Sequence, residues 1–303
     1  MSSDGQLHAI DEQSLIDNGW LTRWNAPGVA GFTGQWEMVL EGFQRMISST
    51  ESVPAVDTLN FPPVIARSVI DTTEYADSFP HLLGTIKTLD ESDAAQYLHE
   101  VSQGTPEDQL REVSDVVLVP ATCYSLYPLV AERGENIPSG TIYSVMGNCF
   151  RAEASTELGR FRSFRMREFV YFGNLDETTA WRDRRADVAV EMFAKLGMTA
   201  EKELATDPFF RPLKRVMAPS QMEQQLKYEL VVPITEDRRI AIASANLHKD
   251  HLCHRFEIHG EDGEVGTSTC AAFGLERVLL ALIAHHGLDL DAWPDAVTGE
   301  LGL

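Results

Sequence analysis

Arginines are the residues in this sequence whose type and spacing best suit chemistry. The stretch FRAEASTELGRFRSFRMREFVYFG, residues 150–173, contains five of them: Arg151, Arg160, Arg162, Arg165 and Arg167. Guanidinium groups bind phosphate oxygens through paired hydrogen bonds and stack on flat rings, so the stretch could hold a polyanionic ligand. The same arginines could instead form a solvated charged face answered by Glu153, Glu157 and Glu168. These residues alone leave both interpretations open.

Thiols and imidazoles offer a second kind of chemistry, metal binding. Four cysteines, Cys123, Cys149, Cys253 and Cys270, are scattered along the chain, which fits free thiols or metal ligands in a reducing compartment. By spacing alone, each could be an ordinary buried small residue. The segment HKDHLCH places imidazole and thiol groups close together, which suits a metal site, but it could equally be a polar loop or a pocket wall. Its candidate ligands are His248, His251, Cys253 and His254.

Charge and hydropathy narrow the function classes. The chain of 303 residues has 46 acidic and 25 basic residues, a formal net charge of -21, and this argues against a broad nucleic-acid surface while allowing a small phosphate ligand. No apolar run approaches the length of a membrane span, and the start MSSDGQLHAIDEQ resembles no signal peptide. We therefore expect a cytoplasmic protein with no membrane partner.

The elements that must position these residues follow from hydrophobic periodicity. Apolar residues three and four apart predict helices over 35–51, 178–198 and 273–287. Short runs rich in Val, Ile, Phe and Tyr predict strands in SDVVLVPAT, GTIYSVMGNCFRAE, FRMREFVYFG, YELVVPI, RRIAIASANL and HRFEIHG. Several of these strands follow one another without a helix between them, which indicates an α+β fold, an antiparallel sheet flanked by helices. No linker divides the chain, so we expect one compact domain.

The predicted strands suggest how the arginines are presented. In FRAE, Arg151 and Glu153 are two residues apart and would project from one face of a strand. SFRMREF follows after a turn-like STELG, so a hairpin would gather Arg151, Glu153, Arg165 and Arg167, or their alternates, around one surface. Arg277 falls at the start of an apolar helix, where free amides also favour an anion. The sequence lacks the glycine-rich phosphate loops, so side chains would hold any phosphates.

Together these segments resemble the class II aminoacyl-tRNA synthetases. FRAE with RMREF looks like their motif 2, AAFGLERVLLAL looks like motif 3, and FPPVIARSVI, with Pro62 and Pro63, looks like a degenerate motif 1. VVLVPATCYSLYP resembles the stretch with which seryl enzymes grip the amino acid, with Cys123 in the position of a glutamate. That departure is similar to the zinc-dependent seryl enzymes of methanogens and, above all, to their shortened bacterial homologues, the amino acid:carrier protein ligases.

The resemblance implies a set of site residues. One zinc ion per chain would be held by Cys123, Glu168 and Cys270, with an open position for the substrate amine. Arg151 would bridge the amino-acid carboxylate and the α-phosphate, Glu153 would accept from the adenine amino group, and Arg277 would lie over the adenine. Arg160 and Arg162 would lie near the outer phosphates of ATP, which arrives with Mg²⁺. Phe161 and Ser244 complete the expected ATP site. The strand RRIAIASANLH lacks the acidic residue that the class usually places there and offers only Ser244 and Asn246.

The same resemblance implies the reaction and its partners. We expect activation of glycine or alanine as an adenylate, transfer to the phosphopantetheine thiol of an acidic carrier protein, and a homodimer built around motif 1. The resemblance also implies an N-terminal helical or irregular segment over 1–50 and a class II synthetase-like catalytic domain over 51–303. Charging of tRNA is the less favoured alternative, because about 50 residues leave no room for the long tRNA-binding arm of the seryl enzymes and the net charge is -21. A non-catalytic regulator that binds ATP or an amino acid is the other alternative. FFRPLKRVM could dock the carrier or be a loop with buried phenylalanines; its candidates are Phe209, Phe210, Arg211, Lys214 and Arg215.

Overall fold

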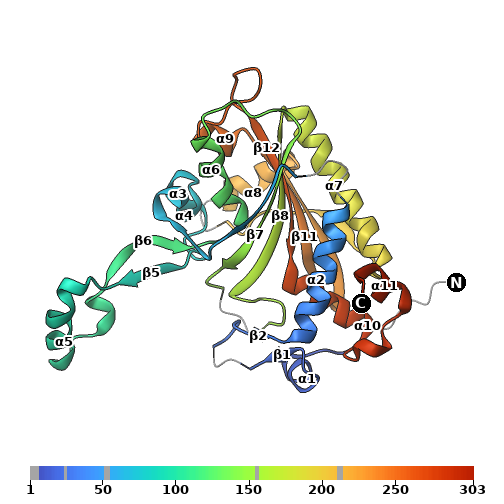
Figure 1. The fold of residues 1–303 in the computed structure, drawn as a ribbon, viewed down its shortest axis with the longest axis horizontal. Coiled ribbons are helices and arrows are strands. Elements are labelled where there is room, and N and C mark those ends of the chain that lie inside the picture. The colour runs from blue at the N-terminus through green and yellow to red at the C-terminus, as the bar shows by residue number, and fades with distance from the viewer. Residues whose placement is uncertain (1–6, 24–25, 51–54, 154–156, 210–213) are drawn as a thin grey trace.

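A seven-stranded sheet forms the centre of the computed structural model, which describes residues 7–23, 26–50, 55–153, 157–209 and 214–303 (Figure 1). The strand order is β3-β7-β8-β12-β11-β10-β9, and every neighbouring pair is antiparallel except β3 with β7. The strands are β3 (Asp57–Phe61), β7 (Thr141–Phe150), β8 (Ser163–Gly173), β9 (Glu201–Leu204), β10 (Lys227–Thr235), β11 (Arg238–Lys249) and β12 (Thr267–Gly274). This confirms the α+β fold with an antiparallel sheet flanked by helices.

Three long helices cover one face of this sheet. They are α2 (Gly34–Ser49), α7 (Leu175–Lys195) and α10 (Leu275–His286), each within three residues of its predicted start and end. Helix α7 begins with a capping box between Asn174 and Glu177. The shared core contains Trp36, Phe193 and Phe273, all almost completely buried. Helix α2, which lies within residues 1–50, packs into the same core as the sheet. The predicted division of the chain at residue 50 stays a prediction.

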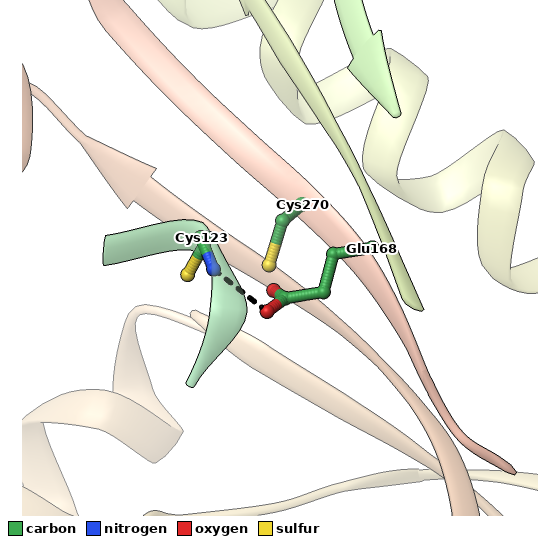
Figure 2. A group of neighbouring side chains, drawn as sticks. All are labelled: Cys123, Glu168 and Cys270. Carbon is green, nitrogen blue, oxygen red and sulfur yellow. Dashed lines mark hydrogen bonds between the residues drawn. The ribbon is translucent and has the colours of Figure 1, made fainter. Parts of the chain in front are cut away.

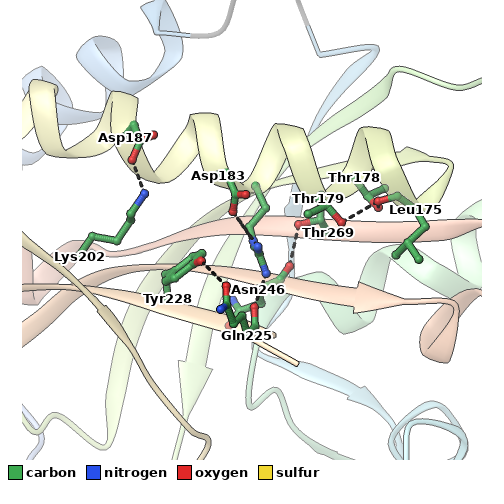
Figure 3. A network of polar contacts seen from close by, with 11 residues as sticks. Leu175, Thr178, Thr179, Asp183, Asp187, Lys202, Gln225, Tyr228, Asn246 and Thr269 are labelled. Atoms are coloured by element: carbon green, nitrogen blue, oxygen red, sulfur yellow. Dashed lines mark hydrogen bonds and ion pairs between the residues drawn. The ribbon is translucent and has the colours of Figure 1, made fainter. Parts of the chain in front are cut away.

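Polar contacts also fasten α7 to the edge of the sheet (Figure 3). Lys202 of β9 forms an ion pair with Asp187 of α7. Arg182 of α7 donates to the carbonyl of Gln225, just before β10, and its guanidinium lies 4.7 Å from the centre of the Tyr228 ring. These contacts fix the edge strands relative to the helical layer.

Smaller elements cover the opposite face. The 3-10 turn η3 (Thr122–Ser125), α6 (Leu126–Glu132) and α9 (His251–Arg255) pack there, with α3 (Arg67–Thr72) and α4 (Tyr75–Ser78) beside them (Figure 1). The segment HRFEIHG, predicted as a strand, lies instead at the end of α9 and in the turns that follow. That prediction was wrong because Phe256, at the end of α9, and Ile258, in the loop that follows, pack into the core beside Tyr127 of α6 without forming a strand.

Strand β12 lies near the middle of the sheet, between β8 and β11, although the sequence did not reveal it. Its residues 268–273 are all buried, so the apolar and polar residues do not alternate. A strand covered on both faces gives a continuous apolar run that cannot be told from the start of a helix by periodicity. The predicted helix over 273–287 therefore included the last two residues of this strand.

Two further parts complete the chain. A three-stranded sheet, β4 (Val64–Ala66), β6 (Glu112–Leu118) and β5 (Thr85–Thr88), projects from the body and ends in α5 (Ala94–Ser102) (Figure 1). The remaining short elements are α1 (Glu12–Asp17), β1 (Leu21–Thr22), β2 (Gly31–Phe32), α8 (Lys214–Glu223) and α11 (Asp295–Leu301). Within the described ranges, none of the helices has both the length and the apolar character needed to cross a membrane.

Candidate metal and nucleotide site

Cys123, Glu168 and Cys270 come together on the sheet face that η3 and α6 cover. Their two sulfur atoms and one carboxylate oxygen all lie within 4.8 Å of one another, and Figure 2 shows the side chains gathered around one point. The exposed fractions of the three residues are 5%, 2% and 2%. We call these three residues the buried cluster. Within the part of the chain that the structure describes, this is the one group of at least three potential metal ligands.

Strand register explains why residues so far apart in sequence meet. Cys270 of β12 lies opposite Val170 of β8, two positions from Glu168, so both functional side chains project from the same face. Cys123 comes from η3, and its backbone N–H donates to Glu168 Oε1 at 2.9 Å. That hydrogen bond ties the turn to the strand and orients the carboxylate.

The electrostatics of the buried cluster favour a cation. Burial and the nearby Cys270 raise the pKa of Glu168 to about 8. Cys270 accepts a hydrogen bond from Cys123, and this lowers the pKa of Cys270 while raising that of Cys123. Burial thus favours the protonated form of the Glu168 carboxyl group, and the hydrogen bond between the two thiols favours ionisation of Cys270 over Cys123. A divalent cation would favour the ionised forms of all three groups.

The donor set fits zinc. Two thiolates and one carboxylate are ligands that Zn²⁺ accepts, and three protein ligands leave one position of a tetrahedron open. Hard cations such as Mg²⁺ prefer all-oxygen sites, so two sulfur atoms disfavour them here.

The arginines expected to bind ATP are arranged differently from the prediction. Strand β7 ends at Phe150, so Arg151 and Glu153 lie just beyond it rather than on the strand. Arg151 Nε donates to the Pro120 carbonyl at 3.3 Å, and its guanidinium lies 5.4 Å from the centre of the Phe164 ring. The chain leaves the ladder here but stays close to β8, since the Arg151 N–H still bonds the Arg162 carbonyl.

Arg165 and Arg167 do not share that surface. Arg165 donates to Glu276 of α10 at 2.7 Å and to Glu37 of α2, whereas Arg167 donates to the Gln44 carbonyl of α2. Both therefore project from the helix-covered face of β8, opposite Glu168. The expectation that the hairpin gathers all four charged residues on one surface was wrong, because Arg151 lies beside Phe164, an even-numbered position of β8 facing away from α2.

The remaining predicted ATP residues surround the loop between β7 and β8. Arg160 pairs with Glu153 at 3.0 Å and also with Glu157, so part of the arginine-rich stretch is internally neutralised. Arg277 Nε donates to the Gly159 carbonyl at 3.0 Å, which places the motif 3 arginine against this loop. Ser244 lies on β11 opposite Ala272, the residue paired with Glu168, and so borders the buried cluster.

Two predicted ATP residues make mainly internal contacts. The Phe161 ring packs edge-on against Phe32, with 5.8 Å between ring centres. The Arg162 N–H donates to the Gly28 carbonyl at 2.6 Å, while its Nε is buried without a hydrogen-bond partner.

The alternative metal segment does not converge. His251 and His254 are exposed on α9, whereas Cys253 is buried beneath it. His248 turns instead toward Tyr127, whose hydroxyl lies 2.9 Å from His248 Nδ1. The fourth cysteine, Cys149, is buried beside Thr122, with 3.4 Å between sulfur and hydroxyl.

A second polar group, which the sequence analysis did not predict, lies on the same sheet face as the buried cluster. Lys227 of β10 bonds Asp207 at 2.6 Å and Glu229 at 3.1 Å. Burial alone would raise the pKa of Asp207, but the Lys227 cation outweighs it and lowers this pKa. Glu229 lies directly opposite Ser244, so it supplies on β10 the carboxylate that β11 lacks. The alternation in KYELVVPI could have indicated that Lys227 and Glu229 share a face.

The predicted docking segment is only partly described. Phe210 and Arg211 lie outside the described residues, and Lys214 begins α8. Arg215 is exposed, and Phe209 stacks on Phe79 with 5.2 Å between ring centres. Gln221 of α8 bonds Asp207 twice, so this helix contacts the Lys227 group.

Comparison with known proteins gives consistent results. The sequence profile of the tRNA synthetase class II core domain (G, H, P, S and T) matches residues 107–286. The chain is 38% identical, over 92% of its length and 84% of the relative, to amino acid acyl-carrier-protein ligase 2 of Bradyrhizobium diazoefficiens. It is 24% identical to the type-2 serine tRNA ligase of Methanococcus aeolicus, of which it spans 58%.

A solved structure shares the whole fold. The seryl-tRNA synthetase of M. kandleri, crystallised with an A. aeolicus tRNA, superposes with a TM-score of 0.80 over 99% of this chain and 61% of that one. The sequence identity is 17%, so this likeness concerns the fold alone.

Proposed function

Because the chain belongs to the class II tRNA synthetase core family and to the amino acid acyl-carrier-protein ligases within it, we propose that it activates a small amino acid with ATP and passes it to a carrier protein. The observation that carries this proposal is the buried cluster, which lies on the same sheet face as Ser244, with Arg151 bonded to the Pro120 carbonyl three residues before Cys123. Glycine and alanine are the proposed substrates, and the acceptor is the phosphopantetheine thiol of an acidic carrier.

The buried cluster would hold one zinc ion through Cys123, Glu168 and Cys270. The ion, when bound, supplies a Lewis-acidic position for the neutral amine of the substrate. Glu168 is oriented for this by the Cys123 N–H, and the surrounding apolar residues of η3 and α6 exclude water.

The arginines would bind and orient the two reacting partners. Arg151 binds the substrate carboxylate and the α-phosphate and stabilises the charge that develops as they react. Glu153 accepts from the adenine amino group, and Arg277 lies over the ring. The carboxylate attacks the α-phosphorus in line with the departing pyrophosphate, and positioning supplies much of the rate. This step needs no general base.

The outer phosphates must compete with acidic residues for Arg160. Arg160 is paired with Glu153 and Glu157, so ATP binding would exchange these partners for phosphate oxygens and free Glu153 for the adenine. Arg162, Phe161 and Ser244 complete the proposed ATP site. Glu229, opposite Ser244, adds a carboxylate on the face where magnesium ATP would arrive.

ATP/pyrophosphate exchange against a panel of amino acids tests the first half-reaction. We expect exchange with glycine or alanine, and mass spectrometry should then show an aminoacyl group on a phosphopantetheinylated carrier. Absence of exchange with every amino acid would refute activation, and efficient charging of tRNA at physiological salt would refute the choice of acceptor.

Two assemblies belong to this proposal. FFRPLKRVM, residues 209–217, would dock the carrier through Phe209, Phe210, Arg211, Lys214 and Arg215. The motif 1 region around Pro62 and Pro63, between β3 and β4, would form the homodimer interface. Light scattering at micromolar concentration should give the mass of a dimer; a monomer would contradict this.

A further inference from the structure

The sulfur atom of Cys270 receives a hydrogen bond that no part of the proposed reaction explains. Asn246 Nδ2 lies 3.4 Å from Cys270 Sγ, and the two residues are directly paired across β11 and β12. The Asn246 backbone is fixed as well, because Thr269 Oγ1 donates to its carbonyl at 2.8 Å (Figure 3). The amide nitrogen also lies 3.2 Å from Ser244 Oγ. The Asn246 side chain is therefore held in one direction, toward the sulfur.

His248 is the next residue after Asn246 on that face of β11. Its Nδ1 lies 2.9 Å from the Tyr127 hydroxyl and 3.1 Å from the Ser268 hydroxyl, and these two hydroxyls are 2.9 Å apart. Ser268 lies two residues from Cys270 on the same face of β12, so the His248 ring is held beside the buried cluster.

Charge explains why such donors would matter. Two thiolates and one carboxylate carry three negative charges, so a divalent ion in the buried cluster leaves one negative charge in a site that is almost free of solvent. A buried net charge is costly unless hydrogen-bond donors point at it. Glu168 has the Cys123 N–H for this purpose, and Cys270 has the Asn246 amide.

We propose that Asn246 and His248 are positioning residues that donate to the Cys270 sulfur, fix its direction and increase the affinity of the buried cluster for zinc. This inference rests on the proposed zinc site. Outer donors of this kind typically change metal affinity by about 10- to 100-fold.

The test measures metal affinity directly. Zinc binding to the full chain is followed by competition with a chromophoric chelator, and cobalt is used as a probe whose thiolate charge-transfer bands report on the Co–S bonds. We expect Asn246→Ala and His248→Ala each to weaken zinc binding by about 10- to 100-fold and to shift the cobalt bands. Asn148→Ala, an exposed asparagine on β7, is the matched control and should change neither.

Variants with smaller changes keep the test decisive if an alanine variant does not fold. Tyr127→Phe removes the hydroxyl that orients His248, and Ser244→Ala removes the second partner of the Asn246 amide; both should weaken zinc binding about threefold or more. His248→Gln retains an N–H donor and should recover part of the affinity. Zinc binding by the parent with unchanged affinity in all these variants would overturn the inference and leave the zinc site intact. Failure of the parent itself to bind zinc would overturn both.

Discussion

The buried cluster and the loop between β7 and β8, the two parts of the proposed site, are built on opposite electrostatic principles. Cys123, Glu168 and Cys270 are acidic groups placed together away from water, and no cation accompanies them among the described contacts. Arg160 of the loop is partly exposed and already paired with Glu153 and Glu157. The buried cluster would be completed by binding a cation, whereas Arg160 would exchange its carboxylate partners for phosphate oxygens.

This difference predicts how strongly each region responds to change. A buried group that lacks its counter-charge has no solvent to replace it, so removing one ligand affects the whole cluster. Exposed ion pairs contribute little and are readily exchanged. Substitutions in the buried cluster should therefore have the largest effects, and substitutions at surface cations the smallest.

Loss of a cluster thiol should have the largest effect. Cys123→Ser replaces a soft thiolate by a hydroxyl that binds zinc poorly, so we expect loss of the metal and a fall in ATP/pyrophosphate exchange of at least about 1000-fold, or ~4 kcal/mol. Elemental analysis and exchange assays measure the two losses. Cys149→Ser, a buried thiol outside the cluster, is the matched control. If Cys253→Ser with His254→Ala emptied the site while Cys123→Ser did not, the cluster would be the wrong one.

The free energy of unfolding of the metal-free protein should depend on pH, because the buried cluster then lacks a cation. Burial and Cys270 raise the pKa of Glu168 from near 4.5 to about 8 in the folded chain. A raised folded pKa stabilises the fold fully below the unfolded pKa and loses this contribution as pH rises through the folded pKa. As pH rises from about 4.5 to 8, ionisation of Glu168 should thus lower the free energy of unfolding by a few kcal/mol, at ~1.4 kcal/mol per pKa unit.

Denaturant unfolding of chelator-treated protein measures this effect. The comparison with Glu168→Gln isolates the carboxyl group, because the titration of Cys270 is present in both proteins. The stability of the parent relative to Glu168→Gln should fall as pH rises, and zinc should abolish the trend. A difference that stays constant with pH would show that Glu168 is not held protonated.

Arg151 tests the other region. Arg151→Ala removes the proposed contact with the carboxylate and the α-phosphate, and we expect about a 100- to 1000-fold loss in exchange with zinc content unchanged. Arg160→Ala, at an exposed position already paired with acids, should cost much less and mainly raise the KM for ATP. Equal effects of the two substitutions would mean that the loop acts as one unit.

The sequence anticipated the buried cluster and the fold better than it anticipated the loop. Helices α2, α7 and α10 follow from periodicity, and the motif context brought Cys123, Glu168 and Cys270 into one proposal that the strand register makes geometrically possible. Strand β12 was missed because both of its faces are buried.

The surroundings of the site required the structure. Nothing in the letters FRAE shows that β7 ends at Phe150, because a strand end depends on its partner and on the loop packed over it. The donors to Cys270 come from a neighbouring strand whose register is a tertiary property. Similarly, only the fold shows that Glu229 lies opposite Ser244.

The smallest effect is expected at the proposed docking segment, residues 209–217, which contributes none of the three cluster residues. Changing Arg211, Lys214 and Arg215 to Ala should leave ATP/pyrophosphate exchange nearly intact and slow transfer to the carrier by about tenfold. The reason is that this chain and its proposed partner are both acidic, so a local basic patch would steer their encounter, and its loss should also weaken the salt dependence of transfer.

Stopped-flow or quench measurements at several salt concentrations separate the two half-reactions. A matched triple variant of the exposed cations Lys87, Arg133 and Lys195 should transfer at the parental rate. Equal loss of both half-reactions would show that residues 209–217 support the site through Asp207 and Lys227, and unchanged transfer would place carrier docking on another surface.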